Sequence, residues 1–142
     1  MSLLELVIAM GLAVLLSSAA ALALPRIDAA MQLDTGLRQI AADLQSARTL
    51  AVASARRVRI VFTVGTDRYG RELADDSGQY HRDLGRFLPR GIRVLTANSG
   101  AMIAFSARGD AQNATITLAD TRGTSRALVV NQRGRITILP AS

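Results

Sequence analysis

The stretch MSLLELVIAMGLAVLLSSAAALALPR, residues 1–26, decides the architecture of this chain. Its apolar part, Met1 to Leu24, contains a single charged side chain, Glu5. A helix of this length measures about 36 Å, enough to cross the roughly 30 Å hydrocarbon core of a bilayer. A secretory signal peptide would start with a basic region and a shorter apolar core, which this stretch lacks. We therefore expect a membrane anchor rather than a signal peptide or a buried core helix.

The following segment, residues 25–57, has apolar side chains at helical spacing, which predicts an amphipathic helix. No Gly-Pro break separates it from the apolar run, and Pro25 removes only one backbone hydrogen bond, so we expect a kink and not an end. This apolar face of the helix, which we call the seam, ends at the small, polar Ser54. The prediction is one helix of about 50 residues, half in lipid and half docked on its own domain. The seam residues are Leu33, Leu37, Ile40, Leu44, Ala47 and Ala51.

After Arg57 the apolar period changes from about 3.6 residues to two. Val58, Ile60, Phe62 and Val64 alternate with other side chains, as in a half-buried strand. Five more strands are expected in GIRVLTA (91–97), AMIAFSA (101–107), NATITLA (113–119), SRALVVN (125–131) and RITIL (135–139), separated by turn sequences. GTDRYG (65–70) is interpreted as a turn, and residues 75–90, which lack clean periodicity, as a loop.

Short strands at spacings near ten residues predict an antiparallel meander or a small sandwich. The fold class is α+β, a long N-terminal helix packed on an antiparallel β-sheet domain. Three parts are expected: a transmembrane and assembly helix at 1–25, an amphipathic helix at 26–57, and a β-rich globular domain at 58–142.

Charge is distributed unevenly along the chain. All 17 basic residues are arginine, and residues 56–142 carry fourteen of them against seven acidic residues, a net charge of +7. Such a surface favours acidic partners, including nucleic acid or anionic lipid. We favour the alternative, a compositional preference for arginine on a solvated surface, because net charge concerns non-specific association and not fold.

The residue inventory argues against an enzyme and against a metal site. There is no cysteine, His81 is the only histidine, and no G-x-S-x-G motif offers a serine nucleophile. His81 is expected to be a solvated loop residue. Asp75, Asp76 and Asp83 lack the D-x-D-x-D-G spacing of a calcium loop. No cofactor and no metal are therefore expected.

The N-terminal motif SLLELVIAMGLAVLL (2–16), with an acid at position 5, resembles the start of mature type IV pilins and pseudopilins. The resemblance implies that prepilin peptidase removes a leader before residue 1, leaving Met1 as the processed and methylated N-terminus. The family usually has Phe where this chain has Met1, so the sequence leaves open whether Met1 is the mature N-terminus. In an assembled filament the new amine would pair with Glu5 in an apolar core, where an unpaired charge is costly.

The distal half is similar to the GspH/FimT group, which includes minor pseudopilins of type II secretion and minor pilins of type IV pili. The similarity rests on Phe105 with Gly109, and on Gly134 with Arg135, before the last strand. It implies a structural subunit, a GspH-like minor pseudopilin of a type II secretion pseudopilus. The alternatives are the repeating subunit of a pilus-like filament, or a FimT-like minor pilin that binds DNA in natural transformation.

DNA binding in that group uses a Gly-Arg-x-Arg motif, and here Thr137 replaces the second arginine. Strand alternation would place Arg133 and Arg135 on one face, with two more arginines nearby in the preceding hairpin. These two are Arg122 and Arg126. Such a patch would contact phosphates without reading sequence, and we expect it to bind DNA weakly.

The resemblance also implies partners and location. Other pilin or pseudopilin subunits are expected to bind through the N-terminal helix. The two further partners are prepilin peptidase and, before assembly, the inner membrane. DNA is the less favoured partner. The expected location is the bacterial inner membrane, with the N-terminus cytoplasmic and the globular domain periplasmic, followed by a periplasmic or extracellular filament.

Overall fold

The computed structural model describes residues 2–140, except for the side chains of residues 19–26 inside the first helix. Helix α1 runs from Leu3 to Ser54, a length of 52 residues. This confirms the expected single long helix, and Pro25 lies within it without ending it.

Both ends of α1 are capped by the residues next to them. At the start, the Ser2 hydroxyl accepts a hydrogen bond from the Glu5 N–H at 3.3 Å, which satisfies one of the free donors of the first turn. At the other end, Ala55 adopts the left-handed conformation with φ of 52°, and its N–H bonds back to carbonyls of the last turn. The chain then turns directly into the first strand.

Residues 58–140 form two four-stranded antiparallel sheets rather than one meander. One sheet has the order β3-β2-β1-β5 and the other the order β4-β6-β7-β8. The elements are β1 (Val58–Phe62), β2 (Arg68–Ala74), β3 (Tyr80–Phe87), β4 (Arg93–Ala97), the short turn α2 (Asn98–Ala101), β5 (Met102–Phe105), β6 (Ala114–Ala119), β7 (Ser125–Val130) and β8 (Ile136–Ile138). The six strands expected from alternation are therefore confirmed.

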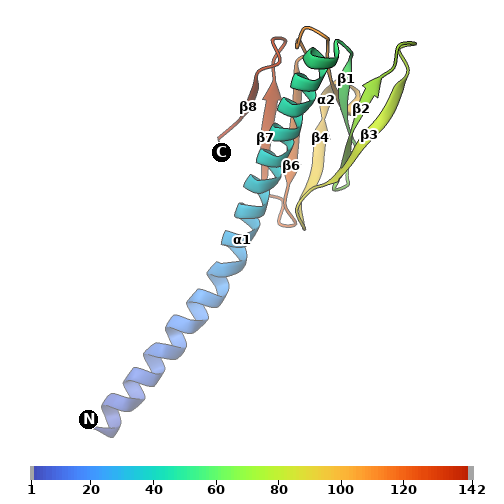
Figure 1. Ribbon diagram of the computed structural model, residues 1–142. Helices are drawn as coiled ribbons and strands as arrows, with labels where there is room; N and C mark the ends of the chain where they lie inside the picture. Colours follow the sequence, from blue (N-terminus) through green and yellow to red (C-terminus); the bar gives the residue numbers. More distant parts are fainter. Residues whose placement is uncertain (1, 141–142) are drawn as a thin grey trace.

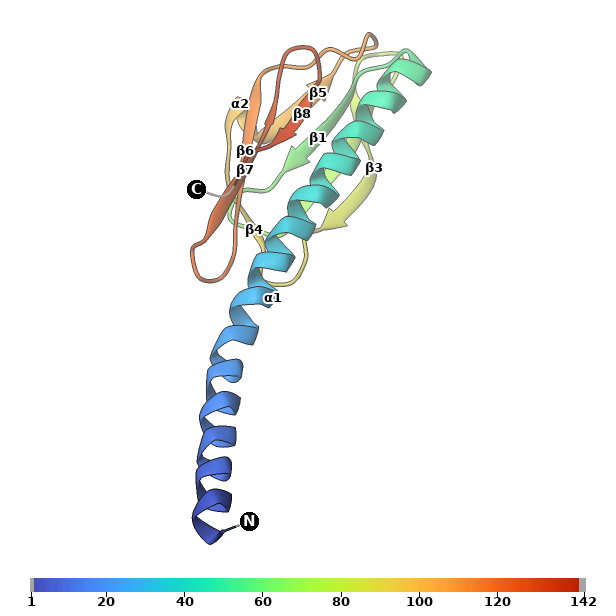
Figure 2. The same cartoon turned by 90° about the vertical axis from the view of Figure 1, so that its left-hand side faces the viewer.

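Helix α1 joins the two sheets into one domain. Its second half lies across both of them and contacts β1 and β5 of one sheet and β6, β7 and β8 of the other (Figures 1 and 2). Its first half extends away from the sheets, with no other described element beside it (Figures 1 and 2). The seam residues named above are each at most 1% exposed, which confirms the predicted helix face. Burying one leucine or isoleucine of this kind contributes about 2 kcal/mol.

Three sequence interpretations were wrong in the first sheet. The turn assigned to residues 65–70 ends at Asp67, and β2 begins at Arg68. The loop assigned to residues 75–90 contains β3, an eight-residue strand. Val64, expected to point inward, lies beyond the end of β1 and is 48% exposed.

The sequence does not reveal β3 because this edge strand is held by backbone pairing and has no buried face. Its register with β2 shifts between Arg71 and Glu72, and this bulge changes which side chains point inward halfway along the hairpin. Period-two alternation is therefore lost. Gly70, which resembles a turn residue, sits inside β2, where a Cβ would lie 2.9 Å from the Leu84 carbonyl oxygen.

A close backbone contact fastens the far end of α1 to both sheets. The Arg48 Nε donates a hydrogen bond to the Gly109 carbonyl oxygen at 3.0 Å. Gly134 packs against both partners of this hydrogen bond. A Cβ at Gly134 would overlap the Gly109 carbonyl oxygen and lie 2.9 Å from the Arg48 Nε. Gly109 and Gly134, which come from separate motifs, therefore meet in one place.

We predict that Gly134→Ala destabilises the protein by about 3 kcal/mol, because strain at a positive φ and overlap with backbone add together. Gly123→Ala is the matched control, since Gly123 also has a positive φ (+87°) but nothing lies within 4 Å of the point that a Cβ would occupy there. Its expected cost is about 1 kcal/mol. Urea unfolding in detergent measures both. Equal losses for the two variants would contradict the proposed packing.

Candidate assembly site

The first half of α1 presents a continuous apolar surface on which no other described element packs. We call residues 3–18 the free helix half, and every one of them is exposed. Monomeric soluble proteins rarely expose so large a contiguous apolar surface, which marks a contact with lipid or with other proteins. Its large apolar side chains are 47–83% exposed: Leu3, Leu4, Leu6, Val7, Ile8, Met10, Leu12, Val14, Leu15 and Leu16.

Within the side chains that the structure describes, no helix is both long and apolar enough to cross a membrane. The span expected from Met1 to Leu24 includes Met1 and residues 19–24, and these positions lie outside the described side chains.

Glu5 lies on the free helix half, in the first turn of α1. A carboxylate there is favoured by the helix dipole and by the free N–H groups of that turn. Its expected partner, the amine of Met1, lies outside the described residues. Among the described side chains, no arginine or histidine forms an ion pair with Glu5.

One flank of the docked helix is tied to β2 and β3 by polar side chains. The amide of Gln39 donates hydrogen bonds to the Tyr69 hydroxyl and to the Phe87 carbonyl, each at 2.8 Å. The Tyr69 hydroxyl donates to Asp43 at 2.5 Å, and Arg86 approaches the same carboxylate at 3.4 Å. Burial, followed by the hydrogen bond to Asp43, raises the pKa of Tyr69.

The sequence analysis did not predict these polar contacts between the helix and the sheet, although the sequence contains a signal for them. Gln39, Asp43 and Ser46 follow one another at steps of four and three, a polar stripe beside the apolar seam. Ser46 completes the stripe by accepting a hydrogen bond from Arg71 at 3.3 Å. A polar stripe at helical spacing next to a buried seam therefore indicates contacts with the sheet edge.

The opposite flank depends on Asp34. Its two carboxylate oxygens accept from Arg38 one turn later, at 2.6 Å, and from Arg126 of β7, at 3.0 Å. The Arg38 hydrogen bond is the main cause that lowers the pKa of Asp34, with Arg126 adding to it against partial burial. Arg126 also donates to the Leu139 carbonyl oxygen at 3.1 Å.

The four candidate DNA-contact arginines separate into two groups. Arg122 lies in the β6–β7 turn, and Arg126 follows it at the start of β7, with its guanidinium engaged by Asp34. Arg133 and Arg135 lie in the β7–β8 turn, at the other end of β7. Six strand residues separate the two turns, which corresponds to about 20 Å. The fold therefore brings together Arg133 and Arg135 but not the whole set.

The acidic residues of the segment 75–83 have structural partners. Asp75 accepts from the Ser77 hydroxyl at 2.6 Å and contacts His81 at 2.8 Å, and these contacts, in that order, lower the pKa of Asp75. Asp76 pairs with Arg56, and Asp83 pairs with Arg71. In the described part of the chain, no group of three or more His, Cys, Asp or Glu is arranged to hold a metal ion. His81 is solvent-exposed as expected, but it lies in β3 and not in a loop.

The geometry matches known structures. The sequence model of the family described as type II transport protein GspH matches residues 37–134. No curated protein sequence matches the chain significantly.

Three solved structures illustrate the likeness in fold. GspH of Escherichia coli, solved in solution, is 13% identical, with a TM-score of 0.68 over 82% of this chain and 94% of that one. The minor pseudopilin EpsH of Vibrio cholerae is 11% identical, with a TM-score of 0.66 over 76% and 96%. The type IV minor pilin FimU of Pseudomonas aeruginosa is 21% identical, with a TM-score of 0.63 over 77% and 89%.

We predict that the Asp34 contacts make stability depend on pH. Since the folded pKa of Asp34 is lowered, its contribution is fully present above the unfolded pKa of about 3.9 and is lost as the pH falls through the lower folded value. Thermal melts between about pH 5 and pH 2 should therefore fall less steeply for Asp34→Asn than for the wild type. Asp28→Asn, on the same helix, is the control, because among the described side chains Asp28 forms no ion pair. An unchanged slope in Asp34→Asn would contradict this assignment.

Proposed function

The chain belongs to the GspH family of type II transport proteins, within the type IV pilin and pseudopilin superfamily, and on this premise we propose that it is a minor pseudopilin that assembles through the free helix half. The family is structural, and membership implies assembly with other pilin or pseudopilin subunits. The observation that carries the proposal is the division of α1 into a buried half and an exposed apolar half. One rigid helix then connects a folded domain to a surface that other apolar helices can cover.

We further propose the route by which the subunit reaches a filament. Pseudopilins are anchored in the inner membrane by the N-terminal helix, with the globular part in the periplasm. For this chain the proposal is that residues 1–25 serve first as the anchor and then as the assembly helix. The same proposal includes cleavage by prepilin peptidase before Met1. It also includes the division of the rest of the chain into an amphipathic helix at 26–57 and a β-rich globular domain at 58–142. The proposed role is structural and requires no reaction of the domain.

Glu5 is proposed as the residue that sets the register of assembly. Among neighbouring apolar helices, a carboxylate without a partner costs several kcal/mol, whereas a pair with the N-terminal amine of a subunit offsets this cost. Only one axial position of the incoming helix brings the two charges together. The carboxylate would therefore select that position instead of adding net affinity.

The FimT-like alternative, with DNA as the partner, receives less support from the geometry. Arg126 is engaged by Asp34, and Arg122 lies a strand length away from Arg133 and Arg135. Two arginines in one turn provide few phosphate contacts, and binding through few contacts is weak at physiological salt. The role of repeating subunit is a further alternative within the same structural class.

We predict that Glu5→Gln, which keeps the size of the side chain, lowers cross-linking to neighbouring subunits by at least about tenfold, because one partner of a desolvated ion pair is lost. The amount of protein in the membrane fraction should not fall, since the helix becomes less polar. Site-specific cross-linking in membranes measures the first quantity, and fractionation the second. Asp110→Asn, which removes an exposed carboxylate from the globular domain, is the matched control. Wild-type cross-linking in Glu5→Gln would count against the proposed pairing.

A further inference from the structure

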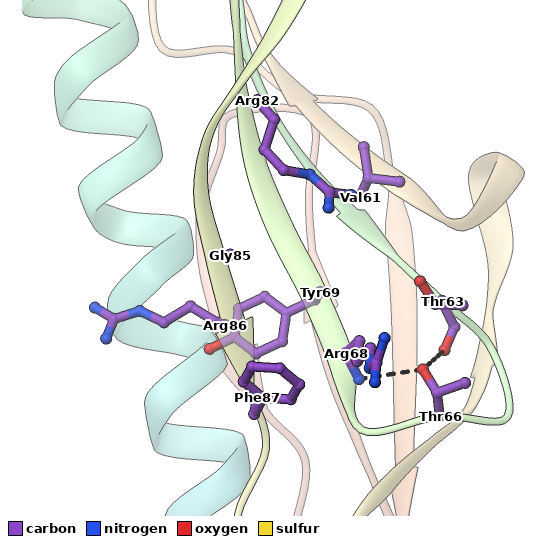
Figure 3. Close-up of a pocket in the computed structure, with 9 residues that line it drawn as sticks. All are labelled: Val61, Thr63, Thr66, Arg68, Tyr69, Arg82, Gly85, Arg86 and Phe87. Carbon is purple, nitrogen blue, oxygen red and sulfur yellow. Dashed lines mark hydrogen bonds between the residues drawn. The ribbon is translucent and has the colours of Figure 1, made fainter.

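The face of the β3-β2-β1-β5 sheet that points away from α1 carries an arginine-flanked hollow. Register places Val61, Gly70 and Gly85 side by side across β1, β2 and β3. Strand alternation puts their row on the outer face, because their neighbours in sequence, Phe62 and Tyr69, are buried. Figure 3 shows this region with its lining residues.

The hollow exists because two adjacent strands have no side chain at the same level. Its volume is about 380 Å³. A Cβ at Gly85 would meet nothing within 4 Å, so the space above it is open. Val61 contributes apolar lining to the hollow, and Thr63 and Thr66 line it as well (Figure 3). The dimensions suit one side chain of a partner.

Three arginines, Arg68, Arg82 and Arg86, line this space. The Arg82 Nε lies 3.5 Å from the position of a Cβ on Gly70, so its guanidinium group reaches over the hollow (Figure 3). Arg68 lines the other side. Among the described side chains, no acidic group forms an ion pair with Arg68 or Arg82. By contrast, Arg86 and the nearby Arg71 pair with acidic side chains, Asp43 and Asp83 respectively.

Apolar surface adjoins these charges. Phe87 is 61% exposed, and the Arg68 guanidinium lies 5.5 Å from the centre of its ring. On the other side of the hollow, Arg59 stacks on Tyr80 at 3.8 Å while it pairs with Glu72 at 2.7 Å, which holds that end of the face in one arrangement. Exposed arginine beside aromatic rings is the composition typical of protein–protein contact sites.

We propose that this face docks an acidic segment of a different protein, with an apolar side chain in the hollow and carboxylates on Arg68 and Arg82. A second copy of this chain is a poor occupant, because the sequence has a formal net charge of +6 and two such domains repel each other. Nucleic acid is disfavoured as well, since Glu72 lies on the same face and neutralises Arg59. The surface is separate from the free helix half.

The test uses the full chain in mild detergent and a fluorescent peptide, Asp-Leu-Asp-Leu-Asp, measured by fluorescence anisotropy. We expect it to bind at least about tenfold more tightly than Asn-Leu-Asn-Leu-Asn, with affinity falling as salt rises. Arg68→Gln and Arg82→Gln should each weaken binding about fivefold. Gly85→Leu should weaken it about tenfold by filling the hollow, and circular dichroism and melting temperature check that this variant folds.

Two controls separate the site from general charge and from the helix. Arg133→Gln removes the same charge from the β7–β8 turn and should leave peptide affinity within about twofold of wild type. Glu5→Gln should also bind the peptide normally, so that failure of helix assembly and failure of this site are distinguishable. Equal losses in Arg133→Gln and Arg82→Gln would overturn the proposal, as would equal binding of the two peptides or no binding of either. A short DNA duplex that binds more tightly than the acidic peptide, with the same dependence on Arg68 and Arg82, would overturn it in favour of nucleic acid.

Discussion

The packing of one apolar helix seam against two sheets is the contact on which the structure depends. On the side that faces α1, the helix is the layer that covers both sheets. The buried side chains of α1 between Leu33 and Ala51 belong to the same core as those of both sheets. Removing the helix would expose the inner faces of both sheets to water. The seam therefore makes one domain from two sheets, and it also fixes the direction in which the first half of the helix leaves the domain.

Polar contacts along the edges of that seam prevent the helix from sliding or rotating. Gln39 and Asp43 hold one flank through Tyr69, Asp34 holds the other through Arg126, and Arg48 ends the contact at the Gly109 carbonyl. Each bond has a modest net value, about 1 kcal/mol, but each also requires one axial position and one rotation of the helix. These bonds therefore fix how the exposed helix half is oriented relative to the domain.

Arginine serves two different purposes in this domain. On the helix-facing side, Arg86 and Arg126 pair with Asp43 and Asp34 of α1, so these charges contribute to docking. On the outer face of the first sheet, Arg68 and Arg82 line a hollow beside Gly85, and neither forms an ion pair among the described side chains. A high arginine content does not by itself distinguish these cases, since net charge concerns association and solubility and not fold.

The sequence by itself determined the long helix, its buried seam and six of the eight described strands, because each of these has one buried face and so leaves a period of 3.6 or 2 residues. The resemblance of residues 2–16 to the start of pilins also indicated the superfamily, in agreement with the family match over residues 37–134. Only the tertiary structure decided the β2–β3 hairpin, whose bulge and exposed edge strand erase alternation. It likewise decided that Asp34 meets Arg126, 92 residues away, and that Arg122 lies far from Arg133. The reason is that periodicity records only which face of an element is buried, whereas contacts between distant residues depend on the order and register in which strands pair.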